Sequence, residues 1–318
     1  MSVTTGKLFD QAHPDLYKKW VIFVWQDQLS DKSLSVLPGE RESHYWGLGD
    51  VIRGMLSTAS VCDKLNVKFC VDMRHHSFGK YFKHIPHDHE KFVDDNIQHV
   101  EMVDYCGMDS IASSHGEQYR TKTLSHHIKT GGDIVLMFTN HMLNGEPNEV
   151  YNNYTQQIKQ VFDPTYASNN IYKQRCRELN VPDKYHVVHL RLGDNSFSKF
   201  HHVETNMSYQ DILQKVHNVL QHRGAVTNNT LLISDNNDFL NHANETDMGY
   251  IIHDYGKSAH VGIKSREKAL ENTLVDVLFL LNSNMNHTFT VYNHQSGFVT
   301  YTSMLNDIIV EYQNILKL

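Results

Sequence analysis

Short apolar segments alternate with longer amphipathic segments along the chain, and this alternation restricts the fold more than any other feature. In the first half, the apolar segments predict strands at Trp20–Trp25, Val67–Val71, His99–Val103 and Asp133–Phe138. The amphipathic segments predict helices at Leu48–Leu65 and Tyr151–Phe162. Buried strands separated by helices form parallel sheets with helices on both faces. We therefore expect an α/β fold.

The second half of the chain repeats this pattern. Predicted strands are His186–Arg191, Thr230–Ser234, Tyr250–His253 and Thr288–Val291. Predicted helices are Ile171–Leu179, Tyr209–His222, Ser265–Leu281 and a final helix from about Tyr301. Two such halves predict two Rossmann-like domains, residues 1–163 and 164–300, with a C-terminal helix over 301–318 that packs across their junction. Ligands of such folds bind at the carboxyl ends of the strands.

Composition excludes several classes of protein. A net charge of −7 over 318 residues, with His neutral, argues against a nucleic-acid partner. The four cysteines contain no CxxC pair, and His84, His87 and His89 match no common zinc spacing, so we expect no metal site. We find no signal peptide and no segment that could span a membrane, and we expect a cytoplasmic protein.

The first motif with chemical content is a glycine pair at the start of the predicted helix Leu48–Leu65. Gly47 and Gly49 would let a ligand approach the backbone, and the unpaired N–H groups of a helix start favour phosphate. Asp50 follows in the first turn. The alternative interpretation is an ordinary helix start in which Asp50 is only the cap.

The second motif is the end of the strand His186–Arg191. Strand alternation puts His189 and Arg191 on the same face, and Asp194 follows where the strand passes into a loop. A buried cation is unfavourable unless it faces a cleft, and an Arg there can hold a phosphate through two hydrogen bonds. The alternative is an Arg–Asp salt bridge that only orders the loop.

Two further motifs end other strands or precede helices. Asp235 follows the strand Thr230–Ser234 and could accept hydrogen bonds from a base or ribose, or simply form an Asx turn. Ser296 and Gly297 form a small polar loop before a helix and could bind phosphate. Asp276 lies in the preceding helix, where it could support the site or be a solvated helix residue.

In this order the motifs resemble the superfamily of α1,2-, α1,6- and protein O-fucosyltransferases. The resemblance covers about residues 44–80 and 160–305, and it is strongest at His189–Asp194 and around Ser296. It implies a GT-B fold, in which two Rossmann-like domains face each other across a cleft. The chain departs from many relatives where Leu192 replaces a second arginine and Asp50 replaces an asparagine.

The resemblance also implies roles for single residues. Arg191 would bind the β-phosphate of GDP-fucose, and His189 and Asp235 would lie near the guanine and ribose. The complete implied set of donor-binding residues is Gly47, Gly49, His189, Arg191, Asp235, Ser296 and Gly297. The donor is a substrate, so no cofactor and no metal are expected.

The implied reaction is inverting transfer of a sugar to a hydroxyl of a glycan or other acceptor. Arg191 and Asp50 are the candidate catalytic residues, and Asp194 and Asp276 are candidate supporting residues. Either Asp50 or a donor phosphate oxygen would take the acceptor proton. Two alternatives stay open: another donor such as GDP-mannose or a UDP-sugar, and a nucleotide- or glycan-binding module without catalysis.

Overall fold

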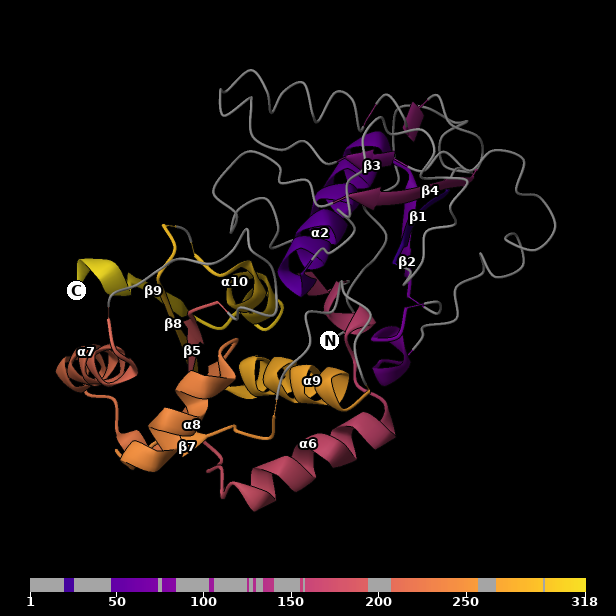
Figure 1. Cartoon of the computed structure of the whole chain (residues 1–318). Helices are drawn as coiled ribbons and strands as arrows, with labels where there is room; N and C mark the ends of the chain where they lie inside the picture. The colour runs from indigo at the N-terminus through magenta and orange to yellow at the C-terminus, as the bar shows by residue number, and fades with distance from the viewer. Residues whose placement is uncertain are drawn as a thin grey trace. The chain divides into compact units, whose positions relative to one another are not determined.

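The chain forms two compact units in a computed structural model, shown in Figure 1. Contacts group Met1–Glu42 with Asp50–Asp163, and Ser43–Gly49 with Pro164–Leu318. The structure describes residues 20–25, 47–73, 76–83, 103–105, 125, 128–129, 134–139, 155–156, 158–193, 207–256, 267–293 and 295–318. Asp194, His84, His87 and His89 lie outside these residues.

The first unit contains a four-stranded parallel sheet in the order β2-β1-β4-β3. Its described elements are β1 (Trp20–Val24), α2 (Leu48–Leu65), β2 (Lys68–Asp72), η2 (Gly79–Tyr81), β3 (Val103–Tyr105) and β4 (Ile134–Thr139). The bounds of α2 are those predicted, and its apolar face is buried at Val51, Met55 and Cys62. Residues 155–156 and 158–161 are helical, within the helix predicted for Tyr151–Phe162.

The second unit contains a five-stranded parallel sheet in the order β7-β6-β5-β8-β9. Its strands are β5 (His186–Arg191), β6 (Thr230–Ser234), β7 (Ile251–Ile252), β8 (Met285–Thr290) and β9 (Val310–Asn314). Its helices are α6 (Tyr166–Glu178), α7 (Tyr209–His222), η3 (Thr227–Asn229), α8 (Asn237–Thr246), α9 (Glu267–Asn282), α10 (Gly297–Met304) and η4 (Ile315–Lys317). The predicted mixed α/β fold with parallel sheets is confirmed.

Both faces of this second sheet are covered by helices. On one face, Val188 and Leu190 pack with apolar residues of α7 and α8. On the other face, Val187 and Leu231 pack with Val275 of α9 and further residues of α9 and α10. Successive residues of β5 therefore enter opposite cores, which explains why the neighbouring residues Val187 and Val188 are both apolar.

Local capping explains where the helices of this unit begin. The side chain of Thr165 accepts a hydrogen bond from the backbone N–H of Ser168, so α6 begins at Tyr166 and not at the predicted Ile171. Ser208 and Asp211 form a reciprocal capping box, and α7 begins at the predicted Tyr209.

The predicted helix over 301–318 is wrong. α10 already begins at Gly297 and ends at Met304, the chain turns at Asp307 with φ of 54°, and β9 then pairs with β8 in parallel. The sequence after Ile308 is partly apolar and is compatible with either a helix or a strand. The segment forms a strand because it can pair with the edge of β8. This pairing satisfies backbone N–H and C=O groups that the short segment could not satisfy alone.

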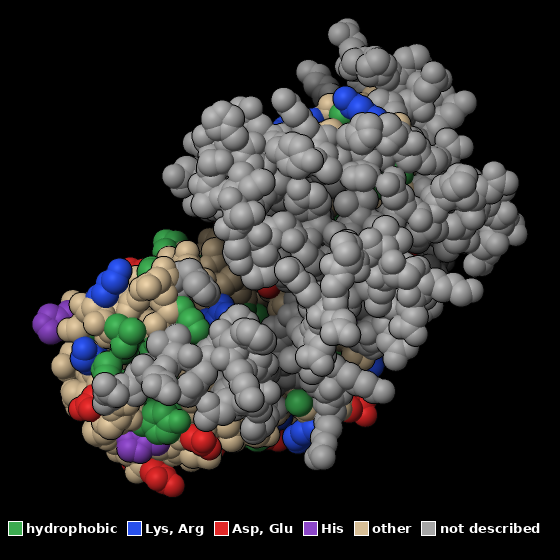
Figure 2. All heavy atoms as spheres, turned by 45° about the horizontal axis from the view of Figure 1, so that its top comes forward, with side chains coloured by type: hydrophobic (Ala, Val, Ile, Leu, Met, Phe, Trp, Pro, Cys, Tyr) green, Lys and Arg blue, Asp and Glu red, His purple; other side chains and the backbone are tan. Residues whose placement is uncertain are grey.

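The described surface carries side chains of mixed type. Figure 2 shows acidic, basic and hydrophobic side chains interspersed on its described part. Exposed large hydrophobic residues include Tyr166, Val226 and Ile309. Such residues are normal when scattered. In the described part of the chain, no helix is long and apolar enough to cross a membrane.

The buried His287 and the partly buried His186 lie at the amino-terminal end of the second sheet. The rings of His186 and His287 stack with centroids 5.7 Å apart, and His287 Nδ1 lies 3.2 Å from a carboxylate oxygen of Glu311. Burial, with a contribution from His186 and Arg223, lowers the pKa of His287 to about 4. His287 is therefore neutral in the folded protein at neutral pH.

We predict that His287 makes the fold less stable as the pH falls from about 6.5 towards 4. In this window the unfolded state binds the proton at the ordinary pKa of 6.5, whereas the folded state does not, so stability is lost with falling pH. Urea unfolding at pH 7 and pH 5 measures the effect. The loss between the two pH values should be smaller in His287→Gln than in the wild type, and an equal loss would contradict the prediction.

Candidate functional site

Polar side chains gather at the carboxyl ends of the strands in the second unit. His189 lies on the face of β5 that packs with α10, and its ring lies 5.7 Å from that of Phe298. Burial, together with the nearby Arg191, lowers the pKa of His189 to about 3, so its imidazole is neutral at neutral pH. Its Nδ1 atom is buried and has no hydrogen-bond partner among the described residues.

Arg191 ends β5 and is partly exposed. Its guanidinium carbon lies 5.1 Å from the centre of the Tyr292 ring, within the range of a cation–π contact. It makes no ion pair with any residue that the structure describes. Its guanidinium can therefore serve an anionic ligand at this edge of the sheet.

Asp235 holds the loop that follows β5. Its carboxylate accepts hydrogen bonds from the backbone N–H groups of Leu192 at 2.8 Å and Gly193 at 3.2 Å. Gly193 has φ of 79°, a conformation that favours glycine. Burial raises the pKa of Asp235 to about 6, although these N–H groups and Arg191 act in the opposite direction. The carboxylate thus orders the loop beside Arg191, and its predicted place beside a ribose stays a prediction.

The amino terminus of α10 carries an uncapped serine. Ser296 occupies the N-cap position and is buried, yet its side chain makes no capping hydrogen bond. Its Oγ atom has no hydrogen-bond partner in the described part of the chain. A buried hydroxyl without a partner is rare, and beside the unpaired N–H groups of a helix start it is suited to bind an anion.

Gly49 lies directly against this helix start. It groups with the second unit, whereas the sequence placed the glycine loop in the first domain. A Cβ atom on Gly49 would lie 2.2 Å from the carbonyl carbon of Gly297, which is closer than any real contact. Gly47 precedes it and is partly exposed. Glycine is therefore required at position 49 by a backbone-to-backbone contact.

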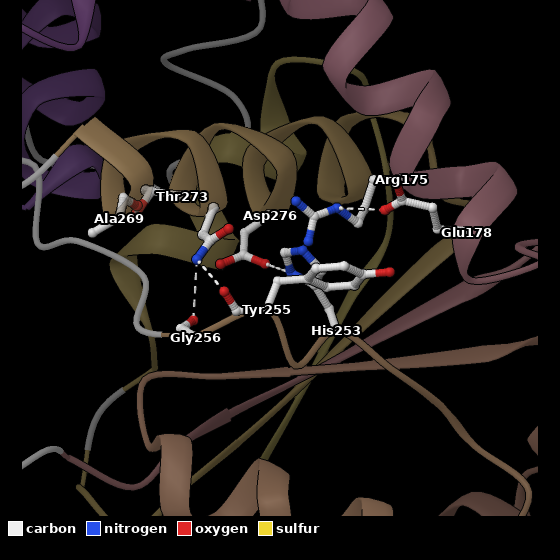
Figure 3. A network of polar contacts seen from close by, with 9 residues as sticks. Arg175, Glu178, His253, Tyr255, Gly256, Ala269, Thr273 and Asp276 are labelled. Carbon is white, nitrogen blue, oxygen red and sulfur yellow. Dashed lines mark hydrogen bonds and ion pairs between the residues drawn. The ribbon is translucent and has the colours of Figure 1, made fainter.

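Asp276 and His253 form a buried pair, shown in Figure 3. His253 Nδ1 lies 2.7 Å from Asp276 Oδ1, and both side chains are almost fully buried. Asp276 is therefore not the solvated helix residue of the alternative interpretation. No sequence motif marks His253, although it ends the predicted strand Tyr250–His253.

Asp50 lies in the first turn of α2 and is assigned to the first unit. Its carboxylate forms an ion pair with Arg53 at 2.7 Å, and its side chain is 38% exposed. An accessible carboxylate can accept a proton from a bound hydroxyl. Among the described residues, no group of three or more His, Cys, Asp or Glu side chains could hold a metal ion.

This chain is similar in structure to solved fucosyltransferases. NodZ α-1,6-fucosyltransferase co-crystallised with GDP is 12% identical, with 93% of this chain and 95% of that chain covered and a TM-score of 0.50. The same enzyme soaked with GDP-fucose is 11% identical, with the same coverage and a TM-score of 0.52. Selenomethionine NodZ from Bradyrhizobium is 12% identical, with 93% and 94% covered and a TM-score of 0.50.

The chain has the fold of these fucosyltransferases. The resemblance drawn from the motifs is therefore confirmed at the level of the fold. No protein-family model matches the sequence, and no curated protein sequence matches it either. The activity of this chain with a fucosyltransferase fold must be argued from its own residues, because identities near 12% support architecture alone.

We predict that Gly49→Ala destabilises the fold far more than Gly297→Ala. The added methyl group at position 49 would collide with backbone, whereas at position 297 its nearest neighbour is Tyr301 at 3.8 Å, an ordinary contact. Overpacking of this kind costs about 1–3 kcal/mol. Chemical unfolding of both variants measures the difference. Equal stabilities would show that the two backbones are not in contact.

Proposed function

We propose that the chain is an inverting, metal-independent glycosyltransferase that moves fucose from GDP-fucose to a hydroxyl of a glycan or other acceptor. The observation that carries the proposal is the buried Ser296 hydroxyl at the start of α10, against Gly49. This hydroxyl has no hydrogen-bond partner in the described ranges of the chain. Arg191, at the carboxyl end of β5, lies in the same unit as Ser296 and Gly49. Together these groups are suited to a diphosphate.

The comparisons support the nature of the donor. Neighbours with the same fold were solved with GDP and with GDP-fucose. A GT-B arrangement, with the donor on the second unit and the acceptor on the first across a cleft, is part of the proposal. The predicted roles of Gly47, Gly49, His189, Asp235, Ser296 and Gly297 in donor binding belong to it as well.

In the proposed reaction, the acceptor oxygen attacks C1 of the sugar from the face opposite the diphosphate. The bond between C1 and the phosphate oxygen breaks through an oxocarbenium-like transition state, and GDP leaves with the electron pair. The negative charge that grows on the diphosphate is the main barrier. Arg191 and the N–H groups at the helix starts can stabilise this charge, which is why the proposal needs no metal.

We expect GDP to raise the melting temperature of the protein and UDP to have no effect. A ligand at about 100 times its dissociation constant adds about 2.7 kcal/mol of stability. A shift with UDP alone would favour a UDP-sugar as donor. Binding of GDP without transfer or hydrolysis of GDP-fucose would favour a binding module, and transfer from GDP-mannose in place of GDP-fucose would change the donor sugar.

We predict that Arg191→Ala lowers the rate of fucosyl transfer by about 10²–10³-fold, the usual loss when one charge-stabilising contact is removed. Stability should change little, because Arg191 is partly exposed and has no ion-pair partner among the described residues. Arg177→Ala, at an exposed position on α6, is the matched control and should keep full activity. Wild-type turnover in Arg191→Ala would refute its assigned role.

We predict that Asp50→Asn lowers transfer by about 10²–10⁴-fold if Asp50 is the base that takes the acceptor proton. GDP binding should be kept, because the substitution preserves size and most hydrogen bonds. Asp63→Asn, later on the same helix, is the control. A loss below tenfold would assign the proton to a donor phosphate oxygen, and a parallel loss of GDP binding would make Asp50 structural.

A further inference from the structure

The guanidinium of Arg191 lies against an aromatic ring. Its central carbon is 5.1 Å from the centre of the Tyr292 ring, within the range of a cation–π contact. The nearby carboxylate of Asp235 accepts hydrogen bonds from the backbone N–H groups of Leu192 and Gly193. Among the residues that the structure describes, Arg191 has no ion-pair partner. The ring is therefore the contact that orients its guanidinium.

The chain on the amino side of Tyr292 is tied to the end of β5. In the parallel register of β5 and β8, Thr290 lies opposite Arg191. The backbone N–H of Val291 donates to the carbonyl oxygen of Arg191 at 3.3 Å. The backbone N–H of Tyr292 donates to Oγ1 of Thr290 at 2.8 Å. The residue with the ring and the residue with the guanidinium thus leave neighbouring strands at the same level of the sheet.

The last strand of the sheet, β9, holds the carbonyl side of Tyr292. Its carbonyl oxygen accepts hydrogen bonds from Nδ2 of Asn314 at 3.0 Å and from the hydroxyl of Tyr312 at 3.3 Å. The side chain of Asn314 is itself buried, and its Oδ1 atom accepts from the backbone N–H of Leu316 at 2.9 Å. Two neighbouring strands therefore fix the backbone of Tyr292 on both sides of the residue.

The ring of Tyr292 is buried and neutral. It belongs to the apolar cluster that includes Leu192 and Phe289. Burial and the Asp235 carboxylate raise the pKa of Tyr292 above its ordinary value, although Arg191 acts in the opposite direction. The phenol is therefore uncharged at neutral pH, and its attraction for Arg191 comes from the face of the ring and not from a phenolate.

A ring suits this position better than a carboxylate would. An arginine side chain has many rotamers, and a guanidinium that must be placed during the reaction stabilises the transition state less than one already in place. A carboxylate partner would orient the guanidinium but would also neutralise it. An aromatic face orients the guanidinium and leaves its N–H groups and its charge available to a phosphate.

We infer that Tyr292 is a positioning residue for Arg191, and that the face of its ring keeps the guanidinium where it meets the departing diphosphate. This inference rests on the proposed function. Loss of the ring should lower the rate more than it weakens donor binding. A misplaced guanidinium still attracts the anionic donor, whereas stabilisation of the transition state depends on a fixed geometry.

The test compares Tyr292→Phe with Tyr292→Leu in steady-state transfer from GDP-fucose. Phenylalanine keeps the ring face, and leucine removes it. We expect Tyr292→Leu to lower kcat by about tenfold, with a change in the donor KM of less than about threefold. Tyr292→Phe should keep about half of the wild-type kcat or more. An equal loss of kcat in both variants would overturn the role of the ring face.

A double-mutant cycle shows whether Tyr292 acts through Arg191. When Arg191 is already alanine, Tyr292→Leu should lower kcat no further, because the guanidinium that the ring positions is gone. A structural role would lower kcat in both backgrounds. A loss of about tenfold in the Arg191→Ala background would therefore overturn the inference.

The matched control is Tyr250→Leu. Tyr250 packs against the same apolar cluster, but it precedes β7 and lies at the amino-terminal end of the sheet. This variant should be less stable than the wild type and keep its kcat. An equal fall of kcat in Tyr250→Leu and Tyr292→Leu would attribute both losses to a looser fold and overturn the inference.

If Tyr292→Leu does not fold, Tyr292→Met replaces it in every comparison. The flexible methionine side chain can fill the space of the ring, but it has no aromatic face. The same fall of about tenfold in kcat is expected.

The outcomes separate the inference from the proposed function. A wild-type protein that binds GDP and transfers fucose, with a kcat of Tyr292→Leu within about twofold of the wild type, would overturn only the role of Tyr292. A wild-type protein that does not bind GDP would overturn the proposed function and this inference together.

Discussion

The position of β5 at the centre of the second sheet determines where the polar groups of the candidate site lie. It pairs in parallel with β6 on one side and β8 on the other, and both of its faces are covered by helices. A charged side chain on such a strand is tolerated where the strand leaves the core. Arg191 therefore lies at its carboxyl end, two residues after the buried His189, at the edge to which β6, β7 and α10 bring their own polar residues.

The chemistry of this edge combines one cation with several neutral donors. The chain carries a net charge of −7, and His189 stays neutral because burial and Arg191 lower its pKa. In the proposed function, the negative charge of the diphosphate would be stabilised by Arg191, by the Ser296 hydroxyl and by the N–H groups of the helix starts. These groups would bind the diphosphate of the donor at a fixed place.

Several parts of the architecture could be predicted because they depend on local pattern. The bounds of α2, β5, α7 and β6 agree with those expected from apolar periodicity and capping residues. The strand β9 could not be predicted, because its short sequence is compatible with both a helix and a strand. It forms a strand because it pairs with β8. The start of α6 depended on the Thr165 cap, which the periodicity does not include.

The sequence by itself determined the alternation of strands and helices, and with it the edge of the sheet at which Arg191, Asp235 and Ser296 would lie. Only the tertiary structure decided which of these groups already have partners. Asp235 binds the backbone of a loop more than 40 residues away, whereas the Ser296 hydroxyl has no partner among the residues that the structure describes. His253 and Asp276, 23 residues apart, meet only because β7 and α9 pack together. Hydrogen bonds of this kind depend on distances across the core, and a periodic pattern in one segment contains no information about them.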